Sequence, residues 1–230
     1  MIALRDVEFS YDGVRPALVV PSLDIAPGLT MVVGANGSGK STLLRITAGV
    51  ERPRKGTVSV DGRDLWRDEV AARSSLAFVP EHPELTPYAS IADVLQLVAR
   101  LRGATYEDVA NSLDRVGLLE VAWHTVRELS MGQRRRALFA TALLGDPRTV
   151  ILDEPLETMD LGMRDLITAW TRARRASGAT VVLATHDLEP FAEDVDSVIV
   201  VREGNVRVVA ASDLGASRLV SLEKLAASSS

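Results

Sequence analysis

Residues 34–42 of the chain read Gly34-Ala35-Asn36-Gly37-Ser38-Gly39-Lys40-Ser41-Thr42. This stretch follows the apolar run 31–33 and precedes the helical sequence Leu43-Leu44-Arg45-Ile46, so a strand, a glycine-rich loop and a helix follow one another. Glycines allow the backbone to turn consecutive N–H groups toward one anion, and the helix N-terminus adds partial positive charge. The stretch therefore predicts a loop that cradles phosphate groups.

The loop matches the Walker A pattern in the structural context that this pattern requires. Lys40 would bridge the β- and γ-phosphates of a nucleotide, and the Ser41 hydroxyl would coordinate Mg²⁺. The alternative is a glycine-rich turn ahead of an ordinary helix, but lysine occurs at only three positions, so a chance match is rare. The candidate nucleotide-binding residues are Gly34, Asn36, Gly37, Ser38, Gly39, Lys40, Ser41 and Thr42.

Two carboxylates, Asp153 and Glu154, end the apolar run 149–152. Open α/β sheets bind ligands at the carboxyl ends of their strands. We expect Asp153 to orient Mg²⁺ through water and Glu154 to act as the general base toward the attacking water. A strand that ends in Asp-Glu is, on its own, more often an ordinary exposed strand end, and only the phosphate loop reverses that balance.

A histidine, His186, follows a second apolar strand over 180–184. A lone histidine in such a place is by default a capping or surface residue. At the tip of a strand that neighbours Asp153-Glu154, however, its imidazole would reach the γ-phosphate and position the water. The motifs found so far favour this second interpretation.

A capping box formed by Ser130 and Gln133 begins the helical run 134–144. Three arginines at 134–136 fall in the first turn of this helix, where the helix dipole disfavours cations unless an anion is near. The segment is equally compatible with a plain helix cap and with a phosphate site.

Strands rich in Val, Ile and Leu are predicted at 30–33, 57–60, 76–79, 150–152, 180–184 and 198–201. Several are continuously apolar, which is typical of a parallel sheet buried between helices. Residues 198–209 predict a hairpin, because Glu203-Gly204-Asn205 interrupts them, and alternation near the N-terminus suggests an antiparallel layer. The predicted fold is α/β: a P-loop NTPase core with a mainly parallel sheet, an N-terminal antiparallel β layer and an inserted helical lobe.

The helical lobe is predicted from apolar residues at helical spacing: Ile91, Val94, Val98 and Leu101, then Tyr106, Val109, Leu113 and Val116. Ser90 followed by Asp93 is a plausible helix start. We expect one domain over residues 1–214, with the lobe inserted at about 82–146. Residues 215–230 are expected to form a loosely held tail.

Composition excludes several classes of protein. The 230 residues are 47% hydrophobic, and 26 basic against 31 acidic residues give a net charge of −5, which argues against a nucleic-acid partner. The absence of Cys rules out disulfides, thiolate nucleophiles and iron–sulfur clusters, and the three histidines lack metal-ligand spacing. Arg5, Asp6 and Glu8 stand where a signal peptide would need its apolar stretch, and no run approaches ~20 apolar residues. We therefore expect any membrane role to come through a partner.

Taken together, the motifs resemble the ATP-binding subunits of ATP-binding cassette (ABC) transporters over residues 2–213. Leu129–Gln133 is similar to the LSGGQ signature of that family, and it lies in the family's order between the phosphate loop and Asp153-Glu154. The resemblance implies that Tyr11 stacks on adenine, that the segment ending in Glu81 is the Q-loop beside Mg²⁺, and that Asp160 contacts the opposite subunit.

The resemblance also implies cofactors and partners. Two such subunits meet head to tail, so Ser130, Gly132 and Gln133 would act on the nucleotide of the other subunit. The chain would then be a Mg²⁺-dependent ATPase that uses ATP to close a dimer with a second ABC ATPase subunit, identical or related. Closure would be coupled to transmembrane permease subunits at the cytoplasmic face of the membrane, with residues 83–90 as the candidate docking surface.

Three positions depart from the family pattern. Glu81 stands where the family has Gln, Met131 replaces a signature glycine and so puts any positive φ there in doubt, and Leu156-Glu157 replaces small polar residues. Two alternatives stay open: a non-transport ABC ATPase that remodels nucleic acid or a macromolecular complex, and, more weakly, a GTPase. Against the GTPase, no Asn in the chain is followed by Lys, as a guanine-reading motif requires.

Overall fold

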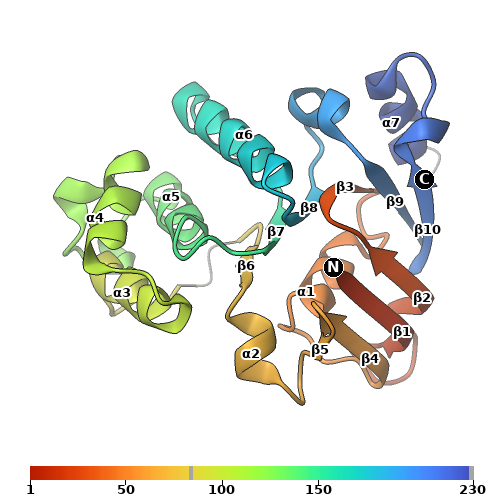
Figure 1. Cartoon of the computed structure of the whole chain (residues 1–230), viewed down its shortest axis with the longest axis horizontal. Helices are drawn as coiled ribbons and strands as arrows, with labels where there is room; N and C mark the ends of the chain where they lie inside the picture. The colour runs from red at the N-terminus through yellow and green to blue at the C-terminus, as the bar shows by residue number, and fades with distance from the viewer. Residues whose placement is uncertain (83–84, 228–230) are drawn as a thin grey trace.

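The computed structural model describes residues 1–82 and 85–227, which are organised around one ten-stranded sheet (Figure 1). The strand order is β5-β4-β1-β2-β10-β9-β3-β8-β7-β6. The strands are β1 Ile2–Phe9, β2 Leu18–Ile25, β3 Gly28–Val33, β4 Lys55–Val60, β5 Arg63–Asp64, β6 Leu76–Val79, β7 Thr149–Asp153, β8 Thr180–Ala184, β9 Ser197–Arg202 and β10 Asn205–Ala210. The α-helices are α1 Lys40–Thr47, α2 Glu69–Arg73, α3 Ile91–Arg102, α4 Tyr106–Arg115, α5 Met131–Ala142, α6 Leu161–Ala176 and α7 Arg218–Ala227.

The parallel part of the sheet runs through β9, β3, β8, β7 and β6. Alternate residues of these strands enter two separate cores: Met31 and Val33 of β3 join one, whereas Val32 joins the other. Both faces are therefore buried, which explains why the strands are continuously apolar. The six predicted strands are confirmed, and four of them are one to two residues longer at an end than predicted.

The N-terminal strands form the predicted antiparallel part. β1 pairs with β2 and β4, and β4 pairs with β5. This part joins the rest of the sheet through β10, where Asn205 pairs with Val19 of β2. The hairpin of β9 and β10 is also confirmed, and its turn places Glu203 at φ 48° and Gly204 at φ 75°.

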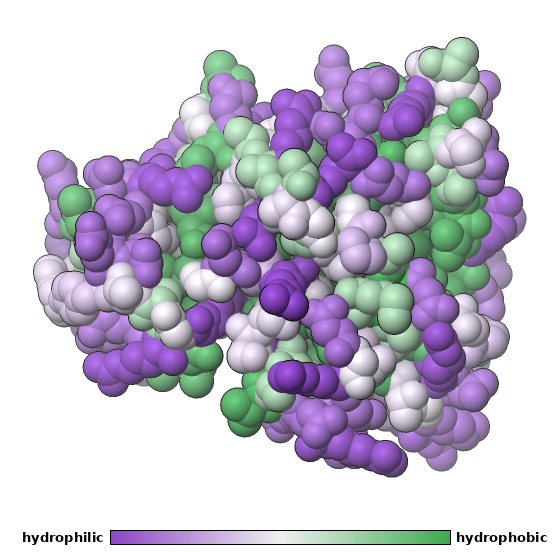
Figure 2. Space-filling model, viewed as in Figure 1, coloured by the Kyte–Doolittle hydropathy of each residue, from purple (hydrophilic) through white to green (hydrophobic). Residues whose placement is uncertain are grey.

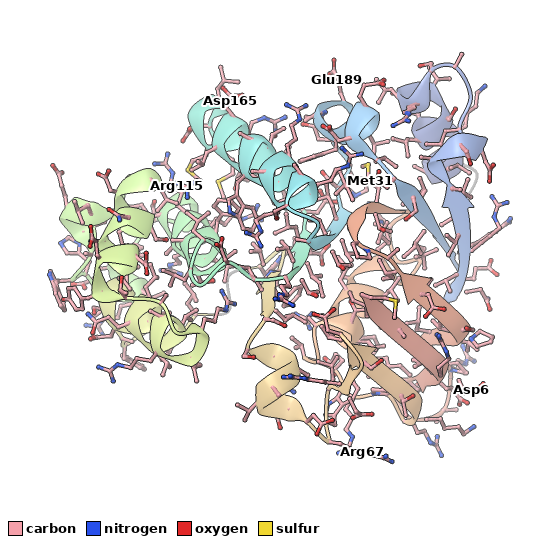
Figure 3. The ribbon with its side chains drawn as sticks, in the orientation of Figure 1. Asp6, Met31, Arg67, Arg115, Asp165 and Glu189 are labelled. Carbon is pink, nitrogen blue, oxygen red and sulfur yellow. The ribbon has the colours of Figure 1, made fainter. Side chains whose placement is uncertain are left out.

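Helices cover both faces of the parallel strands. α1 packs Leu43, Leu44 and Ile46 into the core that it shares with the antiparallel strands, whereas α6 packs Ile167 and Trp170 against the opposite face. The interior is apolar and the surface is charged: buried Met31 lies inside, and exposed Asp6, Arg67 and Asp165 project outward (Figure 3).

Helices α3, α4 and α5 form the helical lobe, which lies to one side of the sheet (Figure 1). The helix start is confirmed, because the Ser90 side chain accepts a hydrogen bond from the Asp93 N–H at 3.1 Å. The predicted apolar faces are only partly right: Leu101 of α3 and Tyr106 of α4 are exposed, and α3 buries Leu95 and Ala99 in place of Leu101. α3 turns its Leu95 and Ala99 side toward α4 and α5, so residues one position away from the predicted stripe form the contact.

Arg102 at the end of α3 anchors the lobe to the sheet. Its guanidinium donates to the carbonyl oxygens of Leu76 on β6 at 2.9 Å and of Thr141 on α5 at 2.6 Å. Burial lowers the pKa of Arg102 to about 10. The cation therefore ties three elements together through carbonyl groups.

The chain beyond residue 214 differs from the expectation of a loosely held tail. Residues Arg218–Ala227 form α7, and its Leu222 is fully buried in the main core. The burial of Leu222 holds α7 against the rest of the protein. The serine-rich end of the sequence gave no sign of this contact. None of the helices formed by the described residues is long and apolar enough to pass through a bilayer.

Candidate nucleotide-binding site

A cavity of about 1040 Å³ opens where the glycine-rich loop meets the carboxyl ends of β7 and β8. Its volume is at the upper end of the range for small-molecule sites. It is lined by Tyr11, Pro16, Ala17, Asn36, Gly37, Gly39, Lys40, Ser41, Thr42, Glu81, Asp153, Glu154, Leu156, Glu157, Arg164, Thr185, His186, Asp187, Glu203 and Gly204. Eleven residues predicted for the site thus come together from separate parts of the chain, and Gly34 and Ser38 lie in the same loop.

The loop backbone has the conformation that its glycines make possible. Gly34 has φ 153°, and a Cβ atom there would lie 2.3 Å from the Val201 carbonyl oxygen. Gly39 has φ 110° and precedes α1, whose first turn receives no side-chain cap from the described residues. The Ser38 hydroxyl is buried and finds no hydrogen-bond partner in the described part of the chain. The loop therefore presents unpaired donors at a helix N-terminus, as anion binding requires.

Lys40 begins α1 and is held over the loop. Its ammonium group donates to the carbonyl oxygens of Gly34 at 2.8 Å and Ala35 at 3.1 Å. Burial lowers the pKa of Lys40, and the carboxylates of Glu154, Asp153 and Glu81 oppose that shift. A partly desolvated cation is thus positioned where a phosphate could replace the carbonyl partners.

The two predicted carboxylates lie at the end of β7. Burial raises the pKa of Asp153, and a hydrogen bond from Ser41 offsets part of this shift. Burial also raises the pKa of Glu154, while the His186 backbone N–H, which donates to Glu154 Oε2 at 3.1 Å, lowers it. A raised pKa brings a carboxylate closer to the proton affinity that a general base needs.

The backbone of Glu154 lies in the left-handed region at φ 47°. A non-glycine residue in this region costs on the order of 1–3 kcal/mol, and such strain concentrates at functional sites. The Glu154 N–H donates to the Ala184 carbonyl oxygen at 2.8 Å, which ties the strained residue to the end of β8. Glu154 thus lines the cavity at the carboxyl ends of β7 and β8.

His186 lies beside Glu154 at the end of β8. Its Nε2 is 3.5 Å from Glu154 Oε1, and its side chain is 64% exposed. The histidine therefore faces the cavity and is not buried in the core. This is the position that the strand argument predicted, since β7 and β8 are neighbours in the sheet.

Tyr11 and Glu81 line the cavity at separate points. The Tyr11 hydroxyl is 3.0 Å from Thr42 Oγ1, and its ring packs edge-on against Phe9 with centroids 4.8 Å apart. Tyr11 as a whole is 64% exposed, which leaves its ring accessible for stacking. Glu81 follows β6 and adds a third carboxylate near Asp153.

Four predicted residues lie elsewhere. Ser130, Gly132, Gln133 and Asp160 are not among the described residues that line the cavity. The capping box is confirmed: Ser130 Oγ accepts from the Gln133 N–H at 3.2 Å, and Gln133 Oε1 accepts from the Ser130 N–H at 2.9 Å. Met131 begins α5 without a positive φ, so the loss of a glycine there leaves the backbone unstrained.

Helix α5 begins at Met131, so only Arg134 lies in its first turn, and the prediction that Arg135 and Arg136 do so as well is wrong. All three arginines contact carboxylates or carbonyl groups of the same chain. Arg135 pairs with Glu157 and Arg136 with Asp160, whereas Arg134 donates to the Leu129 carbonyl oxygen at 3.1 Å. The negative charge beside these arginines is therefore supplied in part by Glu157 and Asp160 of the same chain. Asp160 also caps α6, because its side chain accepts from the Met163 N–H at 3.0 Å.

Sequence reasoning missed several residues that line the cavity. Arg164 of α6 pairs with Asp187 and donates to the Leu156 carbonyl oxygen at 3.4 Å. Glu157 lies on the loop after Glu154, and Glu203 lies in the hairpin turn. The sequence gives no local sign of these contacts, because Arg164 and Asp187 are 23 positions apart.

The oxygen donors suit a hard divalent cation. Ser41, Asp153 and Glu81 offer a hydroxyl and two carboxylates, which match the ligand preference of Mg²⁺. Among the described residues no three His, Asp or Glu side chains form a metal cage. Mg²⁺ at phosphate sites needs no such cage, because it is held by one or two carboxylates together with substrate phosphates and water.

A glycine cradle at a helix N-terminus, a half-buried lysine and strand-end carboxylates on a mostly parallel sheet define a nucleoside-triphosphate-binding protein of the P-loop class. A family model described as ABC transporter matches residues 20–157. The chain belongs to this family.

Known proteins similar to this chain agree with that membership. A putative ABC transporter ATP-binding protein of Halobacterium salinarum is 35% identical over 90% of this chain and 91% of its own length. The sulfate/thiosulfate import ATP-binding protein CysA of Thermosynechococcus vestitus is also 35% identical, over 90% of this chain, which spans 63% of the relative. An ATP-binding cassette solved as a dimer in a post-hydrolysis state with ADP and Pi is 27% identical, with a TM-score of 0.79 and 91% and 98% of the two chains covered.

Proposed function

We propose that the chain is the Mg²⁺-dependent ATPase subunit of a transporter and that it works as a pair on the cytoplasmic face of a membrane. ATP binding closes the pair, and closure is transmitted to membrane-spanning permease subunits. The observation that carries the proposal is the convergence of Lys40, Asp153, Glu154 and His186 on one cavity beside the glycine loop. The names of the relatives favour this function over remodelling of nucleic acid.

Each side chain has a task in the proposed reaction. The loop N–H groups and Lys40 bind the β- and γ-phosphates. Ser41, Asp153 and Glu81 would hold Mg²⁺, which would neutralise charge on the phosphate oxygens. Glu154 accepts the proton of the attacking water, and His186 orients that water and the γ-phosphate.

The second subunit supplies the parts that this cavity lacks. Ser130 is exposed at the start of α5, away from the cavity of its own chain. We propose that Ser130, Gly132 and Gln133 complete the nucleotide site of the opposite subunit and that Asp160 lies at the same interface. In this arrangement ATP stabilises the closed pair because each nucleotide contacts both subunits.

The test is co-purification of the chain from membranes, followed by identification of the proteins that accompany it. We expect polypeptides with several apolar spans of ~20 residues. Binding to DNA or RNA at moderate salt, with no membrane protein retained, would favour the remodelling alternative instead.

A charged substitution on the proposed docking surface separates ATP binding from transport. Of the surface 83–90, positions 83 and 84 lie outside the described residues, Tyr88 is 76% exposed and Leu85 packs partly against the core. We expect Leu85→Glu with Tyr88→Glu to leave ATP affinity within about twofold and to reduce transport by tenfold or more, roughly, because a buried charge opposes docking.

The measurements are nucleotide titration of the purified chain and substrate flux in proteoliposomes. Tyr88→Glu alone guards against loss of folding at Leu85, and Tyr106→Glu, on an equally exposed tyrosine of α4, is the matched control. Unchanged transport in the double variant would count against this surface.

Glu81 is expected to tolerate replacement by glutamine. The amide keeps an oxygen for Mg²⁺ and removes one of the three carboxylates near Lys40, so ATPase activity stays within about twofold. Steady-state hydrolysis at saturating Mg-ATP measures this, with the exposed Glu189→Gln as a control. Loss of hydrolysis in Glu81→Gln alone would contradict the assignment.

A further inference from the structure

Glu157 borders the candidate site and forms an ion pair with an arginine of the helical lobe. Arg135 Nη1 donates to the Glu157 carbonyl oxygen at 2.5 Å, and Nη2 donates to Glu157 Oε2 at 2.7 Å. The Arg135 side chain is only 11% exposed, so water screens this pair less than an ordinary surface ion pair. One guanidinium therefore fixes both the main chain and the side chain of the same loop residue.

The loop held by Arg135 is tightly turned and starts at the proposed general base. Glu154 and Thr158 both have a left-handed backbone, with φ 47° and 57°. The Glu157 N–H donates to the Glu154 carbonyl oxygen at 3.2 Å, so these two residues are the ends of one turn. A shift of Glu157 is therefore passed to the backbone of Glu154.

Arg135 connects the helical lobe to the loop that follows β7. It belongs to α5 in the helical lobe, whereas Glu154 directly follows β7 of the sheet. Figure 1 shows the lobe to one side of the sheet, with α5 on its inner side; Figure 2 shows a notch between the lobe and the rest of the molecule on the viewed face. Through the ion pair between Arg135 and Glu157, a movement of the lobe would therefore displace the loop that holds Glu154.

We propose that Arg135 is a positioning residue, which acts through Glu157 to hold the loop that places Glu154 for attack of water on ATP. The inference rests on the proposed function and extends it. Arg135 is not among the described residues that line the main cavity, so its effect on hydrolysis is indirect. The Glu157 carboxylate lies against the Arg135 guanidinium, so the charge of this largely buried cation is compensated within the chain.

The substitutions Arg135→Gln and Glu157→Gln test the link. We expect Arg135→Gln to lower kcat roughly tenfold with the KM for ATP within about twofold, because misplacement of the base affects the chemical step. Glu157→Gln keeps the hydrogen bond from Arg135 to the Glu157 carbonyl oxygen, so kcat should fall less, roughly threefold. The double variant should be no worse than Arg135→Gln, since both changes break one interaction.

The controls distinguish positioning from a general effect on folding. Arg172→Gln breaks a more exposed ion pair, with Asp194, outside the cavity lining and should leave kcat unchanged. Arg135→Lys keeps the positive charge but lacks the planar guanidinium that bonds two oxygens at once. Its kcat should lie between those of wild type and Arg135→Gln. Hydrogen exchange of the amides in residues 154–160, measured without nucleotide, should be faster in Arg135→Gln.

Several results would overturn the proposal. They are unchanged kcat in both single variants, a raised KM with normal kcat, additive losses in the double variant, or exchange at 154–160 equal to that of wild type. If Arg135→Gln does not fold, Glu157→Gln decides the matter, because the Glu157 side chain is half exposed. A wild-type chain that does not hydrolyse Mg-ATP overturns the proposed function as well, whereas normal hydrolysis in both variants overturns only this inference.

Discussion

Replacing Glu154 by glutamine should reduce ATP hydrolysis by about a thousandfold while ATP still binds. Glutamine has nearly the same shape but cannot accept the proton of the attacking water. Because the chemical step is then blocked, ATP remains in both sites and the closed pair accumulates. Size-exclusion chromatography with Mg-ATP should therefore show a dimer for Glu154→Gln, and the same sample without nucleotide should elute as a monomer.

Glu154 is suited to this test because its surroundings, not its type alone, make it a base. Burial raises its pKa, and the backbone N–H of His186 orients one carboxylate oxygen. Glu189→Gln, on an exposed glutamate three residues beyond His186, is the matched control and should hydrolyse normally. A Glu154→Gln chain that stays monomeric in saturating Mg-ATP, or that hydrolyses ATP at the wild-type rate, would contradict the role of Glu154 as the general base.

Much of the fold could be predicted because its signals are local or periodic. Strands such as β8 are buried on both faces, so their apolar runs stand out, and the glycine loop lies between a strand and a helix that the sequence marks clearly. The convergence of Asp153 and His186 followed from one topological rule, that carboxyl ends of neighbouring parallel strands lie at the same edge.

The rest depends on contacts between distant residues, which periodicity does not encode. The side of α3 that is buried was missed at Leu101, because α4 and α5 decide which side is covered. The sequence left open whether a bound phosphate compensates the arginines of α5. In the structure the Glu157 carboxylate, 22 positions from Arg135, compensates one of them. The helix α7 was missed because Leu222 becomes a core residue only against other elements.

The other large effect concerns Lys40, whose replacement by methionine should weaken ATP binding by about a hundredfold. The ammonium group is half buried and bonded to the carbonyl oxygens of Gly34 and Ala35, so its charge is little screened by water. Methionine keeps the length and apolar stem of the side chain, so the fold should persist and only the phosphate contact is lost. Lys55→Met is the control: it removes the same charge from an exposed ion pair with Glu8, and it should bind ATP normally. Equal affinity in the Lys40 and Lys55 variants, measured by titration calorimetry, would mean that the triphosphate does not lie in the glycine cradle.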